Sequence, residues 1–467
     1  MDNINKGNTE LGTEKISRLI IKYAIPSVVG LLTNAIYAVE DKIFIGNSPE
    51  IGAEGLAAIT VAFPVTNIMT AVATLLGVGG AILFSREQGK EGSNKTAGEV
   101  LGTTISSLIF AGILTTVFGL LFLTPLLKVF GAGLDVLPYA KPYMAILLIG
   151  SSFNYLSLGL NGFVVADGKP KLAMYTSIIG SVGNIILDYV LIVQLNAGLI
   201  GAGLTNVIGQ AFVTMVYFAY FISKKSKTRL ILKNMRIRLD YIKNIVKFGF
   251  SSSIIYVLNA FTGMVMNQAF INYGDDLALS GYGIVNSVQY LLILPLYGIV
   301  QGVQPIFAYN MGAELWSRVK DALKIALSWS LFIGVLVFAA TRLWPESLVA
   351  VFTDSQELRD VAAYMMAIWM IGVPVIGIQT VGASFYQTLG QPIKATLLSS
   401  TRQFIVLVPM LFVLPQFFGF NGVLSAMPIT DYISSSITLI FLVLSYRRLN
   451  ERQEEKTVVK LKSQNTR

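Results

Sequence analysis

Residues 79–91 read Gly-Gly-Ala-Ile-Leu-Phe-Ser-Arg-Glu-Gln-Gly-Lys-Glu, and residues 302–314 read Gly-Val-Gln-Pro-Ile-Phe-Ala-Tyr-Asn-Met-Gly-Ala-Glu. The first glycine, the phenylalanine, the later glycine and the glutamate recur with the same spacing. A second pair of segments, 163–173 and 385–395, shares a phenylalanine, a Gly-x-Pro loop and an alanine, again about 222 residues apart. The chain therefore contains two related halves, and duplication of an apolar chain is typical of membrane transporters.

The composition indicates a membrane protein. Hydrophobic residues make up 54% of the chain and charged residues 13%, whereas soluble domains have roughly 25% charged residues. The segment Ile105–Leu123 contains no charge at all. We predict an all-α integral membrane protein with about twelve transmembrane helices. Their expected ranges are 18–45, 55–85, 97–123, 138–162, 172–194, 199–222, 245–271, 279–309, 321–343, 361–386, 396–418 and 422–446.

The repeat predicts how the two halves are related. About six helices separate equivalent positions, so equivalent helices cross the bilayer in the same direction. We expect two six-helix lobes related by a pseudo-two-fold axis along the membrane normal. The expected parts are a cytoplasmic N-terminal segment (1–17), an N-lobe (18–222), a basic cytoplasmic linker (223–247), a C-lobe (248–446) and a basic cytoplasmic tail (447–467).

The positions of lysine and arginine predict the orientation. Segment 223–247 carries nine of them, whereas the loops at 46–54, 195–199, 272–278 and 416–421 carry none. Positive residues favour the cytoplasmic side, so we expect a multi-pass plasma-membrane protein with both termini in the cytoplasm. The first apolar run is too long for a cleavable signal peptide. The net charge of +9 then reflects helix ends near anionic membrane lipid, and we expect no nucleic-acid partner.

Several classes of chemistry have no residues to support them. Cysteine and histidine are absent, which excludes disulfides, thiol chemistry and histidine metal ligands. The chain has no G-x-x-x-x-G-K-[ST], H-E-x-x-H or D-D-x-x-D pattern, so neither a nucleotide site nor an enzyme is expected. We expect no cofactor, and energy from an ion gradient or from none.

Ionisable residues inside the predicted helices are the functional candidates. Each costs roughly 2.5 to 3.5 kcal/mol on insertion scales, so few are retained without a role. They are Glu40, Asp41, Lys42, Asp188, Arg402 and Asp431.

One group converges in the N-lobe. Asp41, Asp188 and Thr205 all fall in the outer third of the bilayer, and Tyr37 and Asn184 each lie one turn from a carboxylate on the same helix. These oxygen donors suit a proton or a hard monovalent cation such as sodium. The alternative is that the pair at 184 and 188 only joins helices within the lobe. The C-lobe equivalents, however, are valine and methionine, and a coupling site is needed only once.

Arg402 and Asp431 form a second candidate pair. Their expected depths differ by about 6 Å, which an arginine side chain can span. Three roles remain open for them: an ion pair that stabilises the lobe, an arginine that extends to the cytoplasmic surface, or a part in substrate binding or gating, to which Glu40 is a further candidate.

The chain resembles the multidrug and toxic compound extrusion (MATE) transporters, in particular their bacterial branch. The resemblance is carried by the helix 1 stretch from Tyr37 to Gly46, by Asn184 and Asp188, by Gly201-Ala-Gly-Leu-Thr205, and by the Gly-x-Pro loops at 168–170 and 390–392. It implies a twelve-helix, two-lobe, cation-coupled exporter. It also implies a cation site at Asp41, Asn184, Asp188 and Thr205, with Tyr37 beside Asp41.

We therefore expect an antiporter that exports small amphipathic organic cations in exchange for protons or sodium ions, by alternating access of the two lobes. The chain is expected to be bacterial and monomeric. A lipid-linked oligosaccharide flippase of the same superfamily is the alternative function. Such flippases tend to need cationic cavity residues for a pyrophosphate, and Arg402 is the one deeply placed base.

Overall fold

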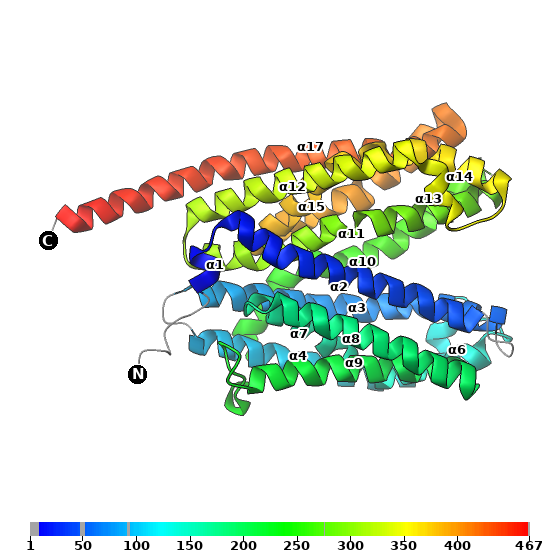
Figure 1. Cartoon of the computed structure of the whole chain (residues 1–467), viewed down its shortest axis with the longest axis horizontal. Helices are drawn as coiled ribbons and strands as arrows, with labels where there is room; N and C mark the ends of the chain where they lie inside the picture. Colours follow the sequence, from blue (N-terminus) through cyan, green and yellow to red (C-terminus); the bar gives the residue numbers. More distant parts are fainter. Residues whose placement is uncertain (1–8, 47–51, 91–93, 275, 466–467) are drawn as a thin grey trace. The chain divides into compact units, whose positions relative to one another are not determined.

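The computed structural model describes residues 9–46, 52–90, 94–274 and 276–465, and the regular secondary structure in these ranges is entirely helical (Figure 1). The longer helices are α2 (Ile16–Gly46), α3 (Gly52–Gly89), α4 (Asn94–Leu121), α6 (Leu137–Ile149), α7 (Ser151–Ala166), α8 (Pro170–Asp188), α9 (Gly198–Ile222), α10 (Leu239–Tyr273), α11 (Asp276–Gly312), α12 (Trp316–Leu343), α14 (Gln356–Trp369), α15 (Val373–Thr388), α16 (Pro392–Ser400) and α17 (Leu407–Asn465). The shorter elements are α1 (Thr9–Thr13), α5 (Leu123–Val129), α13 (Pro345–Ala350), the 3₁₀ turns η2 (Leu232–Asn234) and η3 (Met370–Gly372), and the π-helices η1 (Tyr189–Gln194) and η4 (Thr401–Ile405).

The described helices account for the twelve predicted spans. Ten continuous helical segments, some of which join several elements, are long and apolar enough to cross a bilayer. The bent pair α6 and α7 forms an eleventh span. One of the ten, Pro392–Glu451, is 60 residues long and contains Gly419 with non-helical angles (φ 54°, ψ −133°). Because a single span needs roughly 20 residues, this segment holds two spans that meet at Gly419. The predicted all-α membrane fold is therefore confirmed.

The chain divides into two compact units. The first contains Val29–Val257, and the second contains Leu11–Val28 and Leu258–Arg467. The first part of α2 thus belongs with the second half of the chain, and the first part of α10 belongs with the first half. In the first unit α3, α4, α7, α8 and α9 lie side by side, as α11, α12, α15 and α17 do in the second (Figure 1).

Close backbone packing at two repeat-related glycines explains why the first part of α2 belongs to the second unit and the first part of α10 to the first. In the second unit a Cβ on Gly302 would lie 2.6 Å from the backbone nitrogen of Ala24, so α2 packs directly on α11. In the first unit a Cβ on Gly79 would lie 2.7 Å from the backbone nitrogen of Gly249, so α10 packs directly on α3. Small residues let transmembrane helices approach this closely. The shared spacing within the repeat therefore marks the same helix contact in each unit.

The repeated phenylalanines also contact each other. The rings of Phe84 and Phe163 lie 5.1 Å apart in the first unit, and those of Phe307 and Phe385 lie 5.5 Å apart in the second. All four side chains are fully buried. Aromatic pairs at this separation stabilise beyond the area that they bury. Each unit thus has the same aromatic contact, between α3 and α7 or between α11 and α15.

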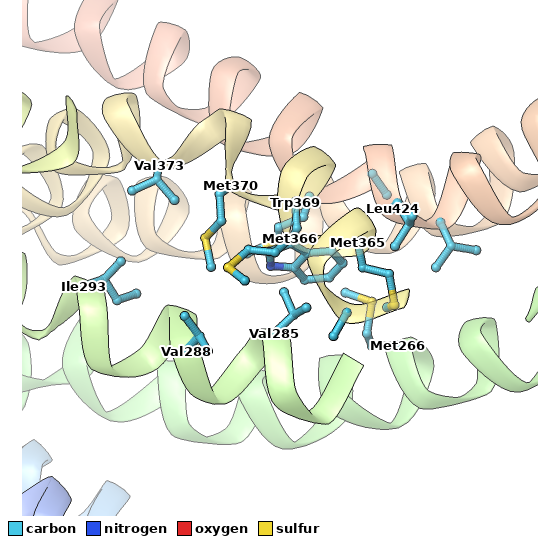
Figure 2. Close-up of a cluster of buried hydrophobic side chains, with 14 of the residues drawn as sticks. Met266, Val285, Val288, Ile293, Met365, Met366, Trp369, Met370, Val373 and Leu424 are labelled. Atoms are coloured by element: carbon cyan, nitrogen blue, oxygen red, sulfur yellow. The ribbon is translucent and has the colours of Figure 1, made fainter. Parts of the chain in front are cut away.

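A methionine-rich cluster fills the core of the second unit (Figure 2). Met266 of α10 and Met365, Met366 and Met370 from the α14–η3 segment pack around Trp369. The Trp369 indole donates a hydrogen bond of 3.1 Å to Gln289 Oε1. Flexible thioethers fill irregular gaps in cores, so these methionines have a packing role.

Each unit interrupts one predicted span at an equivalent glycine. The predicted helix 138–162 bends by 54° between α6 and α7, at Gly150. The predicted helix 361–386 is interrupted by η3, which ends at Gly372. A Cβ on Gly150 would meet the Val207 side chain of α9, and a Cβ on Gly372 would lie 2.6 Å from Asp431 Cβ of α17. The breaks therefore occur where another helix approaches the backbone.

Two segments predicted to lie outside the membrane are partly helical. Helix α10 begins at Leu239, inside the expected linker 223–247, and α17 continues as a helix through most of the expected tail. A helix can continue past the bilayer wherever propensity permits. The predicted linker 223–247 and tail 447–467 therefore stay predictions.

Candidate functional site

A buried carboxylate and a hydroxyl meet in the first unit. Asp188 is the last residue of α8, and Thr205 lies in the second turn of α9. Thr205 Oγ1 donates a hydrogen bond of 2.5 Å to Asp188 Oδ1, and both residues are fully buried. The predicted proximity of these two residues is confirmed.

Two further oxygens at this place have no hydrogen-bond partner among the described residues. They are Asp188 Oδ2 and Asn184 Oδ1, both buried and one helical turn apart on α8. Buried polar atoms are nearly always hydrogen-bonded, so each exception needs an explanation. In the described part of the chain no three Asp, Glu, His or Cys side chains gather to hold a metal ion. The acceptors available here are one carboxylate and neutral oxygens.

A π-helix begins directly after this carboxylate. Residues 189–194 form η1, in which the Leu195 amide donates to the Val190 carbonyl over five residues at 3.0 Å. The second π-helix, η4, contains Arg402, and there the Val406 amide donates to the Thr401 carbonyl at 3.0 Å. Single π-turns occur frequently at functional sites. Sequence reasoning missed both, because no residue pattern distinguishes them from α-helix.

The predicted site residues of helix 1 lie on α2. The side chains of Tyr37, Glu40 and Asp41 are outside the described residues, and their roles stay predictions. Within the first unit α2 lies beside α8 at Gly30, where a Cβ would be 3.9 Å from Ser177 Oγ.

An ion pair is buried in the second unit. Arg402 Nε donates to Asp431 Oδ1 at 2.6 Å, and both side chains are buried. The predicted pairing is confirmed, and of the roles left open the surface-extended arginine is excluded. Asp431 Oδ2 has no hydrogen-bond partner among the described residues and lies against Gly372. The arrangement neutralises both charges within one unit.

Asp167 is a buried acid that sequence reasoning overlooked. Its Oδ1 accepts a 2.8 Å hydrogen bond from Gln88 Nε2. Its Oδ2 accepts from the Tyr220 hydroxyl (2.6 Å), the Ser226 hydroxyl (2.9 Å) and the Lys227 amide (3.0 Å). Burial raises the pKa of the Asp167 carboxyl, against the opposing effect of these hydrogen bonds. The residue fixes the segment after α9 to the ends of α3 and α7.

A signal for Asp167 was present in the repeat. It precedes the first Gly-x-Pro loop, whereas Leu389 holds the equivalent place before the second. An acid in only one copy of a repeated motif indicates a role specific to that half.

Comparison with known proteins agrees with this architecture. The MatE family profile matches residues 26–190 and 252–413, more than half of the chain. The multidrug export protein MepA of Staphylococcus haemolyticus (strain JCSC1435) is 28% identical over 433 residues, covering 92% of this chain and 94% of MepA. MepA of Staphylococcus aureus (strain MSSA476) is 26% identical over 435 residues, covering 93% and 95%.

Solved structures share the fold. The MATE multidrug transporter DinF-BH, determined in complex with a ligand, superposes with a TM-score of 0.85 at 33% identity, covering 92% of this chain and 96% of that one. An outward-facing multidrug resistance MATE transporter of the MOP superfamily gives a TM-score of 0.89 at 20% identity, covering 96% and 99%, and supports the fold alone. With its long apolar helices, its duplicated units and the matched family profile, the chain belongs to the MatE family of multi-pass membrane transporters.

Proposed function

We propose that this protein is a cation-coupled antiporter that exports small amphipathic organic cations in exchange for protons or sodium ions. Asp188 is the coupling residue, and Thr205 and Asn184 are its neutral partners. The two units alternate access to the substrate, with both termini on the cytoplasmic side.

The state of the Asp188 carboxylate carries this proposal. It is fully buried, its described hydrogen-bond donor is the neutral Thr205 hydroxyl, and Oδ2 has no described partner. A carboxylate in such surroundings is stable only when a proton or a cation neutralises it. Uptake and release of that positive charge is what coupling to an ion gradient requires.

The register of α2 supports a second acid at the same depth. Gly30 lies beside Ser177, and positions 41 and 188 each come eleven residues later. Helices 1 and 5 are predicted to run in the same direction, and eleven residues advance both by about 17 Å and about three whole turns. Position 41 is therefore expected at the level of Asp188, and this register supports the proposal of a shared site.

The relatives support the substrate class. MepA is named a multidrug export protein, and DinF-BH is named a multidrug transporter. For this chain we infer that the substrates are amphipathic organic cations. A site built on an acid can release one positive charge, the organic cation, as it takes up another, the proton or sodium ion.

Transport by purified protein in vesicles tests the proposal. Efflux of a fluorescent lipophilic cation is measured under an imposed proton gradient and, separately, under an imposed sodium gradient. One of the two gradients is expected to drive efflux. Equal efflux in the absence of both gradients would exclude coupling.

The flippase alternative receives no support from the second unit. Arg402, the deeply buried base among the residues that the structure describes there, is paired with Asp431, and a neutralised guanidinium is a poor ligand for a pyrophosphate.

A further inference from the structure

A basic cavity lies in the first unit, at the end where α4 begins and the segment after α9 folds back. Its volume is about 900 Å³. Eight of its fifteen lining residues are lysine or arginine, among them Lys95, Lys224, Arg229, Lys233 and Arg236. A cavity lined in this way attracts anions.

The lining residues that the structure describes carry far more positive than negative charge. Glu99 is the one carboxylate among the lining residues that the structure describes. It forms an ion pair with Arg238 and accepts a 2.8 Å hydrogen bond from the Tyr241 hydroxyl. The charge of Glu99 is therefore matched by Arg238 within the cavity wall, and the described lining residues keep a net positive charge.

The cavity wall is held in place before any ligand binds. Ser226 and Lys227 are bonded to the buried Asp167, and Thr228 accepts a 3.0 Å hydrogen bond from Gln88. The Thr103 hydroxyl of α4 donates to the Arg236 carbonyl at 3.0 Å. Preorganisation of this kind lowers the entropic cost of binding.

The first turn of α4 adds to the attraction. Asn94, Lys95 and Gly98 line the cavity, and α4 is 28 residues long. The N-terminus of a long helix carries a partial positive charge and free amide groups, which suit a phosphate.

Apolar side chains beside the cations distinguish a lipid from a soluble anion. Leu232 is 85% exposed and Leu239 71% exposed, and Ile231 and Ile237 are exposed as well. Isolated exposed apolar residues need no explanation. Here, however, four of them lie in one stretch of nine residues, 231–239, that belongs to the basic segment. Basic residues interleaved with exposed aliphatic ones are typical of segments that lie in the headgroup region of a membrane.

We propose that this cavity binds the phosphate headgroup of an anionic phospholipid, with Leu232 and Leu239 entering the edge of the acyl region. Basic pockets at helix ends on the cytoplasmic side are suited to such headgroups. The site does not involve the coupling residues, and it rests on the proposed function only for the orientation of this face. Loss of lipid binding and loss of coupling can therefore be observed separately.

Binding is tested on the purified full-length protein in neutral detergent. Short-chain phosphatidylglycerol, short-chain phosphatidylcholine and inorganic pyrophosphate are titrated, and bound molecules are counted by native mass spectrometry. We expect phosphatidylglycerol to bind more tightly than phosphatidylcholine. The double variant Lys224→Gln with Lys233→Gln should weaken phosphatidylglycerol binding by at least about tenfold, because each basic residue near an anionic surface contributes appreciably.

The matched control is Lys169→Gln with Lys171→Gln, which removes the same charge from two exposed lysines of the same unit outside the cavity. It should leave binding unchanged. Equal weakening in both double variants would overturn the proposal, since only general surface charge would then matter. Absence of preference for phosphatidylglycerol over phosphatidylcholine would overturn it too.

Variants of Leu232 and Leu239 distinguish the two sources of phosphate, a phospholipid headgroup and a soluble phosphate anion. Leu232→Ser with Leu239→Ser should weaken phosphatidylglycerol binding and leave pyrophosphate binding as it was. If these serines change neither, and pyrophosphate displaces phosphatidylglycerol completely, the site is one for a soluble phosphate anion and the lipid assignment is wrong.

Discussion

The two units place buried polar residues on equivalent helices but balance their charge differently. In the first unit Asp188, at the end of α8, accepts from the neutral Thr205 of α9. In the second unit Arg402, in the π-helix after α16, is paired with Asp431 of α17. At the position equivalent to Asp188 the second unit has Met410. The first unit thus contains a buried carboxyl group without a described cationic partner, and the second contains a compensated ion pair.

The positions of these residues show what duplication preserved. The equivalent glycines 150 and 372 both break a helix, yet Gly150 faces Val207 and Gly372 faces Asp431. The helix contacts and the breaks were kept, whereas the polar residues lie at different turns. A carboxylate that can gain and lose a positive charge suits coupling, whereas a compensated pair suits a fixed structure. The following variants test this division of roles.

The largest effect is expected from Asp188→Asn. An asparagine still accepts from Thr205 and keeps the volume, but it cannot carry the charge that a proton or cation neutralises. Gradient-driven efflux should fall by at least about a hundredfold, or about 3 kcal/mol. Asp41→Asn should do the same if helix 1 supplies the second acid. Vesicle transport and thermal unfolding are measured together.

The control for this loss is Asp135→Asn, which removes an exposed carboxylate from a loop of the same unit. It should transport like the wild type. If Asp188→Asn also transports at the wild-type rate with equal insertion, the assignment of coupling to the first unit is wrong.

The second unit should respond mainly in stability. Arg402→Ala or Asp431→Ala leaves a buried charge without its partner, which should lower the free energy of unfolding by about 3 to 5 kcal/mol. Thermal unfolding in detergent measures this change. The double variant should recover much of the loss, because no unpaired charge remains.

Additive losses in this cycle would show that the two residues act independently. A double variant that is stable but cannot export would mean that the pair takes part in transport, and the contrast between the units would fail.

Much of the fold could be predicted from the sequence, because the lengths of the apolar segments and the repeated motifs can be read from it without a structure. Twelve spans follow from helix length in a bilayer, and the recurrence of Phe84 and Phe163 as Phe307 and Phe385 marks the same contact in each unit. Depth along the helices, at about 1.5 Å per residue, made Asp188 with Thr205 and Arg402 with Asp431 candidate pairs, and the structure shows both contacts.

Features that depend on packing between distant segments could not be predicted. The first part of α2 belongs to the second unit because it contacts the backbone at Gly302. The first part of α10 belongs to the first unit because it contacts the backbone at Gly79. The bond from Ser226 to Asp167 joins residues 59 positions apart. The π-helices change the hydrogen-bond register without any change in composition. Each of these is decided by tertiary contacts that periodicity does not contain.

A smaller effect is expected from Thr205→Val, which removes the hydroxyl with little change of shape. The Thr205 hydroxyl donates to Asp188 and so stabilises the ionised carboxylate by about 1.5 to 3 kcal/mol at most. Its loss should therefore tighten the binding of a proton, whereas it should weaken the binding of sodium, which loses an oxygen ligand. The measurement is the ion concentration for half-maximal efflux, which should fall if the coupling ion is a proton and rise if it is sodium. Thr205→Ser keeps the donor and should restore the wild-type curve. Equal curves for valine and serine would show that the hydroxyl does not act on Asp188.

The smallest effect is expected from Asn184→Val, which gives the first unit the residue that the second unit has at the equivalent position, Val406. Asn184 Oδ1 is buried without a described partner, so its removal should not lower thermal stability and should raise it slightly, because an unsatisfied buried acceptor costs about 1 to 3 kcal/mol. The ion concentration for half-maximal efflux should nevertheless rise by about two- to tenfold, since one neutral oxygen is lost from the site. A variant that gains stability while losing ion affinity identifies an oxygen kept for the ion. A variant that loses stability with an unchanged ion-activation curve would show that Asn184 serves only to join helices, as the structural alternative holds.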